Sequence, residues 1–137
     1  MLGAGALLLV GCGPPDEPEV DAATVWGEQL RVSQAALEAY PPNALRSAAD
    51  SRVKQLESLA GATGTAPTAT PSLEAALNAE RRALQAHVAA VGELSDRASR
   101  ELLATLIAGT AEAVSALRAE LDEPPIVDSF PGQRNRP

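Results

Sequence analysis

Aromatic and sulfur-containing side chains are almost missing from this sequence. Its 137 residues include one Trp, one Tyr, one Phe, one Met and one Cys. A single Cys excludes a disulfide within the chain, and an aromatic share of 2% is unfavourable for β-sheets, whose strands are rich in aromatic and β-branched residues. Ala, Leu and Glu are abundant instead, which favours helices packed by small and aliphatic side chains.

Positive charge is also scarce. The chain has 11 Lys and Arg against 18 Asp and Glu, a net charge of −7. Nucleic-acid binding needs clustered Lys and Arg that neutralise phosphates, whereas here only Arg134 and Arg136 stand together away from acidic residues. We therefore expect no nucleic-acid partner. The acidity is typical of a soluble extracytoplasmic domain.

The amino terminus carries a sorting signal. Residues 2–10 are a short run of Leu, Ala, Gly and Val that ends in Leu9-Val10-Gly11-Cys12, and the run is too short to span a bilayer. It resembles the bacterial lipoprotein signal, in which an apolar stretch precedes a Leu-small-small-Cys box, although no Lys or Arg stands before it. The resemblance implies cleavage before Cys12, acylation of that residue, and anchoring on the extracytoplasmic face of the cell membrane.

Composition divides the chain into four segments. Residues 1–11 are the expected signal peptide, and residues 12–20, rich in Pro and acidic residues, form a tether that holds the domain off the lipid surface. Residues 21–122 are amphipathic and form one domain. Residues 123–137 contain Pro, Gly and Asn without a hydrophobic period, and we expect a largely unstructured tail.

Hydrophobic spacing predicts four helices inside this domain, over about residues 22–40, 43–60, 71–93 and 96–122. Capping residues support these limits. Asp21, Asn43, Thr70 and Ser95 or Asp96 are the expected amino-terminal caps, Pro41-Pro42 ends the first helix, and Gly61 closes the second in a left-handed conformation. Residues 61–70 are the expected loop.

The last two helices are predicted from two apolar seams that are out of phase. One seam is Leu73, Leu77, Glu80, Leu84, His87, Val91 and Leu94, and the other is Leu103, Ile107, Thr110, Val114, Leu117 and Leu121. On one continuous helix these seams would face opposite ways. A reversal near residues 92–96 brings them together, which predicts a hairpin and, with the first two helices, an antiparallel four-helix bundle. A three-helix variant with the first helix splayed or swapped is the alternative.

Polar residues interrupt the seams at Ser33, Glu80, His87 and Thr110. A buried carboxylate needs a hydrogen-bond donor. We expect Glu80 to bond Thr110 or a water, and His87 to lie at a half-open seam with one bond. The functional alternative is a ligand site in the middle of the bundle. The charged residues of the second helix are expected on its solvated side: Arg46, Asp50, Arg52, Lys54 and Glu57.

A family resemblance starts from the lipoprotein box and the segment Leu102-Leu103-Ala104-Thr105-Leu106-Ile107-Ala108-Gly109-Thr110-Ala111-Glu112-Ala113. The similarity covers about residues 28–121, which resemble the ferritin-like domain found in lipoproteins of high-GC Gram-positive bacteria. Ferritin-like di-iron proteins use Glu and Glu-x-x-His ligands, but no Glu-x-x-His occurs here, and Thr110 and Ala113 stand where the last helix would hold its ligands. At most Glu80 remains, so the resemblance implies a degenerate bundle with no metal and no cofactor.

Enzymatic motifs are missing too. The chain has no Gly-x-Ser-x-Gly motif and no Gly-rich phosphate loop before a helix, so we expect no catalytic residue and no enzyme. We expect a membrane-anchored helical lipoprotein with a structural or protein-binding role, partnered by the membrane and an envelope protein. The alternatives are an apolar ligand in the bundle core near Glu80, His87 and Trp26, or a ferritin-like domain that has lost its di-iron site.

Overall fold

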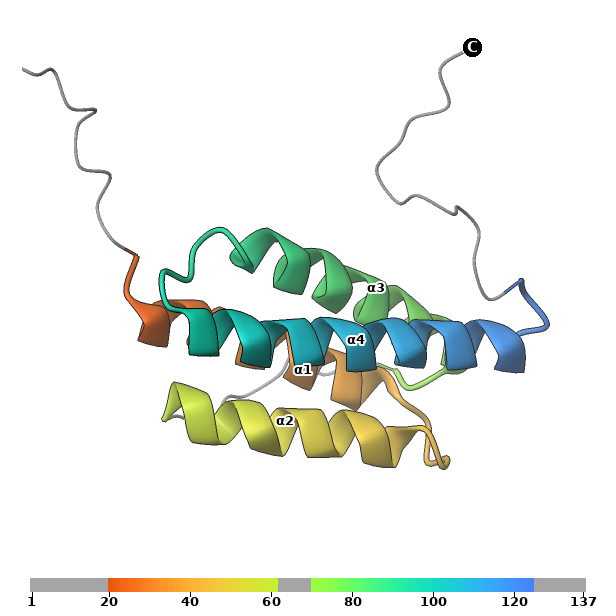
Figure 1. The fold of residues 1–137 in the computed structure, drawn as a ribbon. Helices are drawn as coiled ribbons and strands as arrows, with labels where there is room; N and C mark the ends of the chain where they lie inside the picture. The colour runs from red at the N-terminus through yellow and green to blue at the C-terminus, as the bar shows by residue number, and fades with distance from the viewer. Residues whose placement is uncertain (1–19, 62–69, 125–137) are drawn as a thin grey trace, which may run out of the picture.

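Four helices make up the described part of the chain. The computed structural model describes residues 20–61 and 70–124. Its elements are α1 (Ala22–Ala39), α2 (Arg46–Ala60), α3 (Leu73–Ala90) and α4 (Arg97–Glu120), which lie side by side as a bundle (Figure 1). The prediction of an all-helical bundle with four helices is confirmed. The signal peptide with Cys12, nearly all of the tether, the loop at 62–69 and the tail from 125 lie outside the described residues.

Several helix ends fall where the sequence predicts them. α1 stops at Ala39, just before Pro41-Pro42, because the residue ahead of a proline is forced towards an extended backbone. Gly61 closes α2 with φ 62° and ψ 21°, a left-handed conformation that favours glycine. Asp96 begins α4, and its carboxylate accepts a hydrogen bond from the Ser99 backbone N–H at 2.8 Å.

The predicted start of α3 is wrong. Ser72, rather than Thr70, is the cap, and its hydroxyl accepts from the Ala75 backbone N–H at 3.0 Å. The Ser72 backbone N–H donates to the Ala39 carbonyl at 3.1 Å, a bond to α1 that holds Ser72 extended and delays the helix. α3 also ends at Ala90, three residues earlier than predicted.

Two other caps differ from the prediction. Asn43 accepts from the Arg46 backbone N–H at 3.2 Å, but this bond closes a turn ahead of α2, and Leu45 is the residue at the helix cap. Asp21 does occupy the cap of α1, yet its side chain makes no capping bond to the backbone. The Thr24 hydroxyl donates a hydrogen bond to the Asp21 carboxylate instead, at 3.4 Å.

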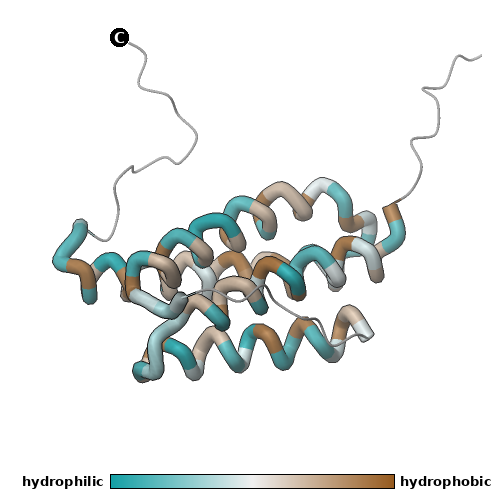
Figure 2. Tube along the Cα trace, turned by 180° about the vertical axis from the view of Figure 1, so that it is seen from behind, coloured by the Kyte–Doolittle hydropathy of each residue, from teal (hydrophilic) through white to brown (hydrophobic). Residues whose placement is uncertain are grey.

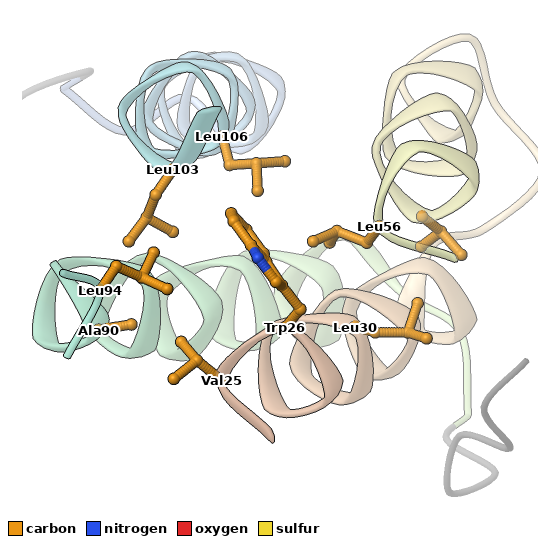
Figure 3. Packing of buried hydrophobic residues seen from close by; sticks show 9 residues of the cluster. Val25, Trp26, Leu30, Leu56, Ala90, Leu94, Leu103 and Leu106 are labelled. Carbon is orange, nitrogen blue, oxygen red and sulfur yellow. The ribbon is translucent and has the colours of Figure 1, made fainter. Parts of the chain in front are cut away.

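The helices pack through two apolar clusters. α1 contacts both α2 and α3, and α4 contacts α3, whereas α2 approaches α4 only sparsely. Hydrophobic and hydrophilic segments alternate along each helix (Figure 2), as expected for amphipathic helices. The cluster around Trp26 (Figure 3) is Val25, Trp26, Leu30, Val53, Leu56, Ala90, Leu94, Leu103 and Leu106. The second is Ala36, Ala39, Tyr40, Ala49, Ala76, Leu77, Ala79 and Leu117.

The two predicted seams belong to two separate helices. A turn separates α3 from α4, and the two helices pack against each other, so the chain does not run through as one rod. Val91 is 39% exposed, contrary to its predicted seam position, because α3 has already ended. α4 is also the one described helix whose length and composition are compatible with a membrane span. A core helix of a water-soluble protein meets the same criterion.

Candidate functional site

Glu80 is the centre of a buried polar cluster. This α3 residue is 1% exposed. The hydroxyl of Tyr40, the residue that follows α1, donates to Glu80 Oε1 at 2.7 Å, and the Arg52 guanidinium of α2 donates to the same oxygen and forms an ion pair with it. The expected bond between Glu80 and Thr110 is therefore replaced by bonds to a phenol and a guanidinium, both stronger donors to a carboxylate.

Arg52 is the residue that sequence reasoning missed. It was expected on the solvated side of α2, but its side chain is only 13% exposed. A second nitrogen, Nη1, donates to the Gly109 carbonyl of α4 at 3.3 Å. The guanidinium thus joins α2 to α3 and α4. The spacing of the helix indicates the position of Arg52. It follows the buried Ala49 by three residues and precedes the buried Leu56 by four, so the three residues share one helix face. We call Tyr40, Arg52, Glu80 and the Gly109 carbonyl the core polar cluster.

Burial governs the protonation of the core polar cluster. Desolvation raises the pKa of the Glu80 carboxyl, while the Arg52 charge and the Tyr40 and Arg52 hydrogen bonds act in the opposite direction. Burial, with the Glu80 charge, raises the pKa of Tyr40 far above its ordinary value, so Tyr40 remains a donor.

His87 is buried in a separate contact. The residue is 0% exposed, and Nδ1 lies 2.7 Å from Oε1 of Gln29 on α1. Because that oxygen can only accept, Nδ1 carries the proton. The other ring nitrogen, Nε2, is buried with no hydrogen-bond partner. Burial and the Arg52 charge lower the pKa of His87 to about 4. The predicted single bond is present, but the predicted half-open position is wrong.

Thr110 is buried as well, and its hydroxyl has no hydrogen-bond partner. The structure buries Glu80, His87 and Thr110 without a hydrogen bond linking any two of them. Across residues 20–61 and 70–124 no group of three or more His, Cys, Asp or Glu side chains is arranged to hold a metal ion. The core polar cluster can stabilise charge inside the bundle, where Glu80 and His87 are at most 1% exposed.

A shallow cleft lies where α2 and α4 separate. Its volume is about 360 Å³, and Tyr40 and Arg52 contribute to its lining together with small residues. Trp26, near which the sequence predicts the alternative ligand pocket, is 5% exposed and packs with Leu56 and Leu106 in the apolar cluster (Figure 3). The remaining residues that line the cleft are Leu45, Ala48, Ser51, Gly109, Glu112, Ala113 and Ala116.

Comparison with models of protein families, with characterised proteins and with solved structures finds no match to this chain. Its function is therefore inferred from its own residues.

Proposed function

We propose that this chain is a membrane-anchored, extracytoplasmic lipoprotein whose helical bundle has a structural or protein-interaction role. The observation that carries the proposal is the box Leu9-Val10-Gly11-Cys12 behind a short apolar run. α1 begins at Ala22, ten residues after Cys12, so acylated Cys12 would hold the bundle near the membrane by a short tether. Several acyl chains give stable anchoring, whereas one chain is marginal.

The buried polar groups support a role without catalysis. A catalytic group has to touch its substrate, and Glu80 and His87 are sealed inside the bundle. We propose that the domain instead presents its helices to an envelope protein, with the membrane as its second partner. The proposal includes no cofactor and no nucleic acid.

The ferritin-like, antiparallel interpretation of the bundle belongs to the same proposal. Its support is that the core polar cluster joins groups from α2, α3 and α4 with Tyr40 at the end of α1, as the ligand sets of ferritin-like proteins join four helices. In this interpretation the Arg52 guanidinium supplies the positive charge that a metal ion supplies in an intact site, and Glu80 is the remaining acidic partner.

The anchoring proposal is tested by Cys12→Ser in the full chain. We expect the wild-type protein in the membrane fraction and labelled by radioactive palmitate, and the variant unlabelled and released. Gly13→Ser is the matched control, because it changes the adjacent residue and leaves the box intact. Equal membrane recovery of the Cys12→Ser variant would reject the anchor.

A second candidate function is binding of a small apolar ligand, which the cleft between α2 and α4 favours. Its volume of about 360 Å³ lies within the range of small-molecule sites. The test is titration of the full chain with anilinonaphthalene sulfonate. Ala113→Trp would fill the cleft and abolish binding, whereas Ala89→Trp, on an exposed position of α3, would not. Equal binding by the two variants would exclude the cleft.

A further inference from the structure

Three large hydrophobic side chains are exposed to solvent within the described ranges 20–61 and 70–124. They are Val20, Val88 and Val91, which are 47%, 54% and 39% exposed. Val88 lies in the last turn of α3, Val91 is the cap of that helix, and Val20 stands two residues ahead of α1. One exposed valine on a protein surface needs no explanation, whereas exposed apolar residues gathered in one place mark a contact site.

These three side chains belong to the same end of the bundle. Val25, in the first turn of α1, packs with Ala90 and Leu94 at the end of α3 (Figure 3). The start of α1 and the turn between α3 and α4 accordingly lie at one end of the bundle (Figure 1). At the opposite end, the Ser72 backbone N–H ahead of α3 donates to the Ala39 carbonyl of α1. We call the end that carries Val20, Val88 and Val91 the valine end.

The valine end is also the end nearest to the expected lipid anchor along the chain. Val20 follows Cys12 by eight residues, and a segment of this length spans at most about 29 Å when fully extended. α1 begins at Ala22 and has 18 residues, so the opposite end of the bundle lies about 27 Å further away. A membrane that holds Cys12 therefore meets the valine end first.

Charge at the valine end is nearly balanced. Around Val20 and the α3–α4 turn, two exposed arginines stand against three exposed acidic residues. These are Arg97 and Arg100 on one side and Asp21, Glu93 and Asp96 on the other. Electrostatic attraction to anionic lipids is therefore weak, and binding would come from burial of the apolar surface that the valines still expose.

We propose that the valine end is a membrane-contact surface, at which Val20, Val88 and Val91 enter the interface of the lipid bilayer. The inference rests on the proposed lipid anchor, because three half-exposed valines alone would bind a bilayer only weakly. A short tether makes the contact intramolecular, with an effective concentration in the millimolar range, so a weak apolar contact is sufficient. The bundle would then stand on this end, and its opposite end would face the envelope protein.

The test is quenching of tryptophan emission by vesicles of brominated phosphatidylcholine, because bromine on the acyl chains quenches only indoles that contact the lipid. Val91→Trp in the acylated full chain places an indole at the valine end. Glu74→Trp is the matched control, since Glu74 is an exposed residue in the first turn of α3. Trp26 is 5% exposed and adds the same unquenched emission to both. We expect loss of the added emission in Val91→Trp and no loss in Glu74→Trp.

A second substitution tests whether the valines themselves make the contact. Adding Val88→Ser to Val91→Trp should reduce the quenching, because it removes a neighbouring apolar side chain from the lipid. Adding Ala119→Ser instead, at an exposed position in the last turn of α4, should leave the quenching unchanged. Equal quenching in these two double variants would show that the added indole alone seeks the lipid, and it would overturn the proposal.

The membrane contact and the anchor fail in different ways. If Cys12 carries no acyl chain, its thiol, the only one in the chain, is coupled to a maleimide-bearing phospholipid and the same measurement is made. Equal quenching of Val91→Trp and Glu74→Trp, or none in either, on vesicles that hold the protein rejects the membrane-contact surface even where the anchor stands. Quenching confined to Val91→Trp on the coupled protein supports the contact even where natural acylation is missing.

Discussion

Replacing Arg52 by Met tests whether the buried ion pair holds the bundle together. Met preserves the length and packing of the aliphatic stem and removes every bond of the guanidinium. Glu80, 1% exposed, would keep the Tyr40 hydroxyl as its remaining donor. Loss of one partner of a buried ion pair costs about 3 to 5 kcal/mol, because the other charge stays in the low-dielectric interior without compensation.

The size of the effect depends on the state of Glu80. At high pH the unpaired carboxylate is charged, and the full cost is expected. Because burial raises the pKa of the Glu80 carboxyl, lowering the pH lets it take up a proton, which removes the uncompensated charge, so the free energy of unfolding should fall by less at low pH than at high pH. The double variant Arg52→Met with Glu80→Gln removes both charges and should be more stable than Arg52→Met alone by about 2 kcal/mol.

Urea unfolding, followed by Trp26 fluorescence and circular dichroism, measures all four members of this double-mutant cycle. Lys54→Met is the matched control on the same helix, because its ion pair with Asp50 is solvent-exposed and should not change stability measurably. If the two single changes simply add, with a coupling energy below about 0.5 kcal/mol, Arg52 and Glu80 do not stabilise each other and our interpretation of the core is refuted.

Three further predictions concern single residues. Tyr40→Phe removes a donor to a buried carboxylate and should cost about 1.5 to 3 kcal/mol, more at high pH than at low pH; no dependence on pH would contradict the bond to Glu80. His87 has a lowered pKa, so its contribution to stability is present above about pH 6.5 and is lost as the pH falls through about 4. This loss amounts to about 3 kcal/mol. Urea titrations at several pH values should show the loss in the wild type and not in His87→Gln. Gly61→Ala should lower the free energy of unfolding by about 1 kcal/mol, because Gly61 has φ +62°. Gly27→Ala, with open space at its Cβ position, should raise it by about 0.5 to 1 kcal/mol. Equal thermal unfolding midpoints of the two variants would contradict both predictions.

Local signals predicted most of the helix pattern. The apolar spacing, Pro41-Pro42, Gly61 and Asp96 act through neighbours in sequence, and each has the predicted effect. The start of α3 could not be found in this way, because Thr70-Pro71 and Ser72 both fit a cap. The choice between them follows from the bond between the Ser72 N–H and the Ala39 carbonyl, a tertiary contact that sequence spacing does not reveal.

The sequence predicted two buried polar residues of the candidate site but not their partners. Glu80 and His87 stand out because they interrupt a strongly apolar seam, and both are buried. Their partners were not predicted. Gln29 reaches His87 from α1, and Tyr40 reaches Glu80 from the end of that helix, and the pairing of helices outside a hairpin depends on global packing. Arg52 was assigned to the solvent because α2 is rich in charged and small residues, which leaves its apolar stripe too narrow to fix the orientation of the helix.

A charged residue at this position in α2 follows from the spacing of the helices. α1 packs on both α2 and α3, and α3 packs on α4, whereas α2 and α4 approach each other only sparsely. A short apolar side chain cannot bridge such a gap, whereas the long stem of Arg52 reaches the Gly109 carbonyl and still donates to Glu80. Gly109 lacks a side chain, and its Cβ position lies 3.6 Å from Arg52 Cδ, so a larger residue than Ala would push the stem aside. The ion pair thus fixes the position of α2 through directional bonds, and it makes the same helix sensitive to any change that neutralises Glu80.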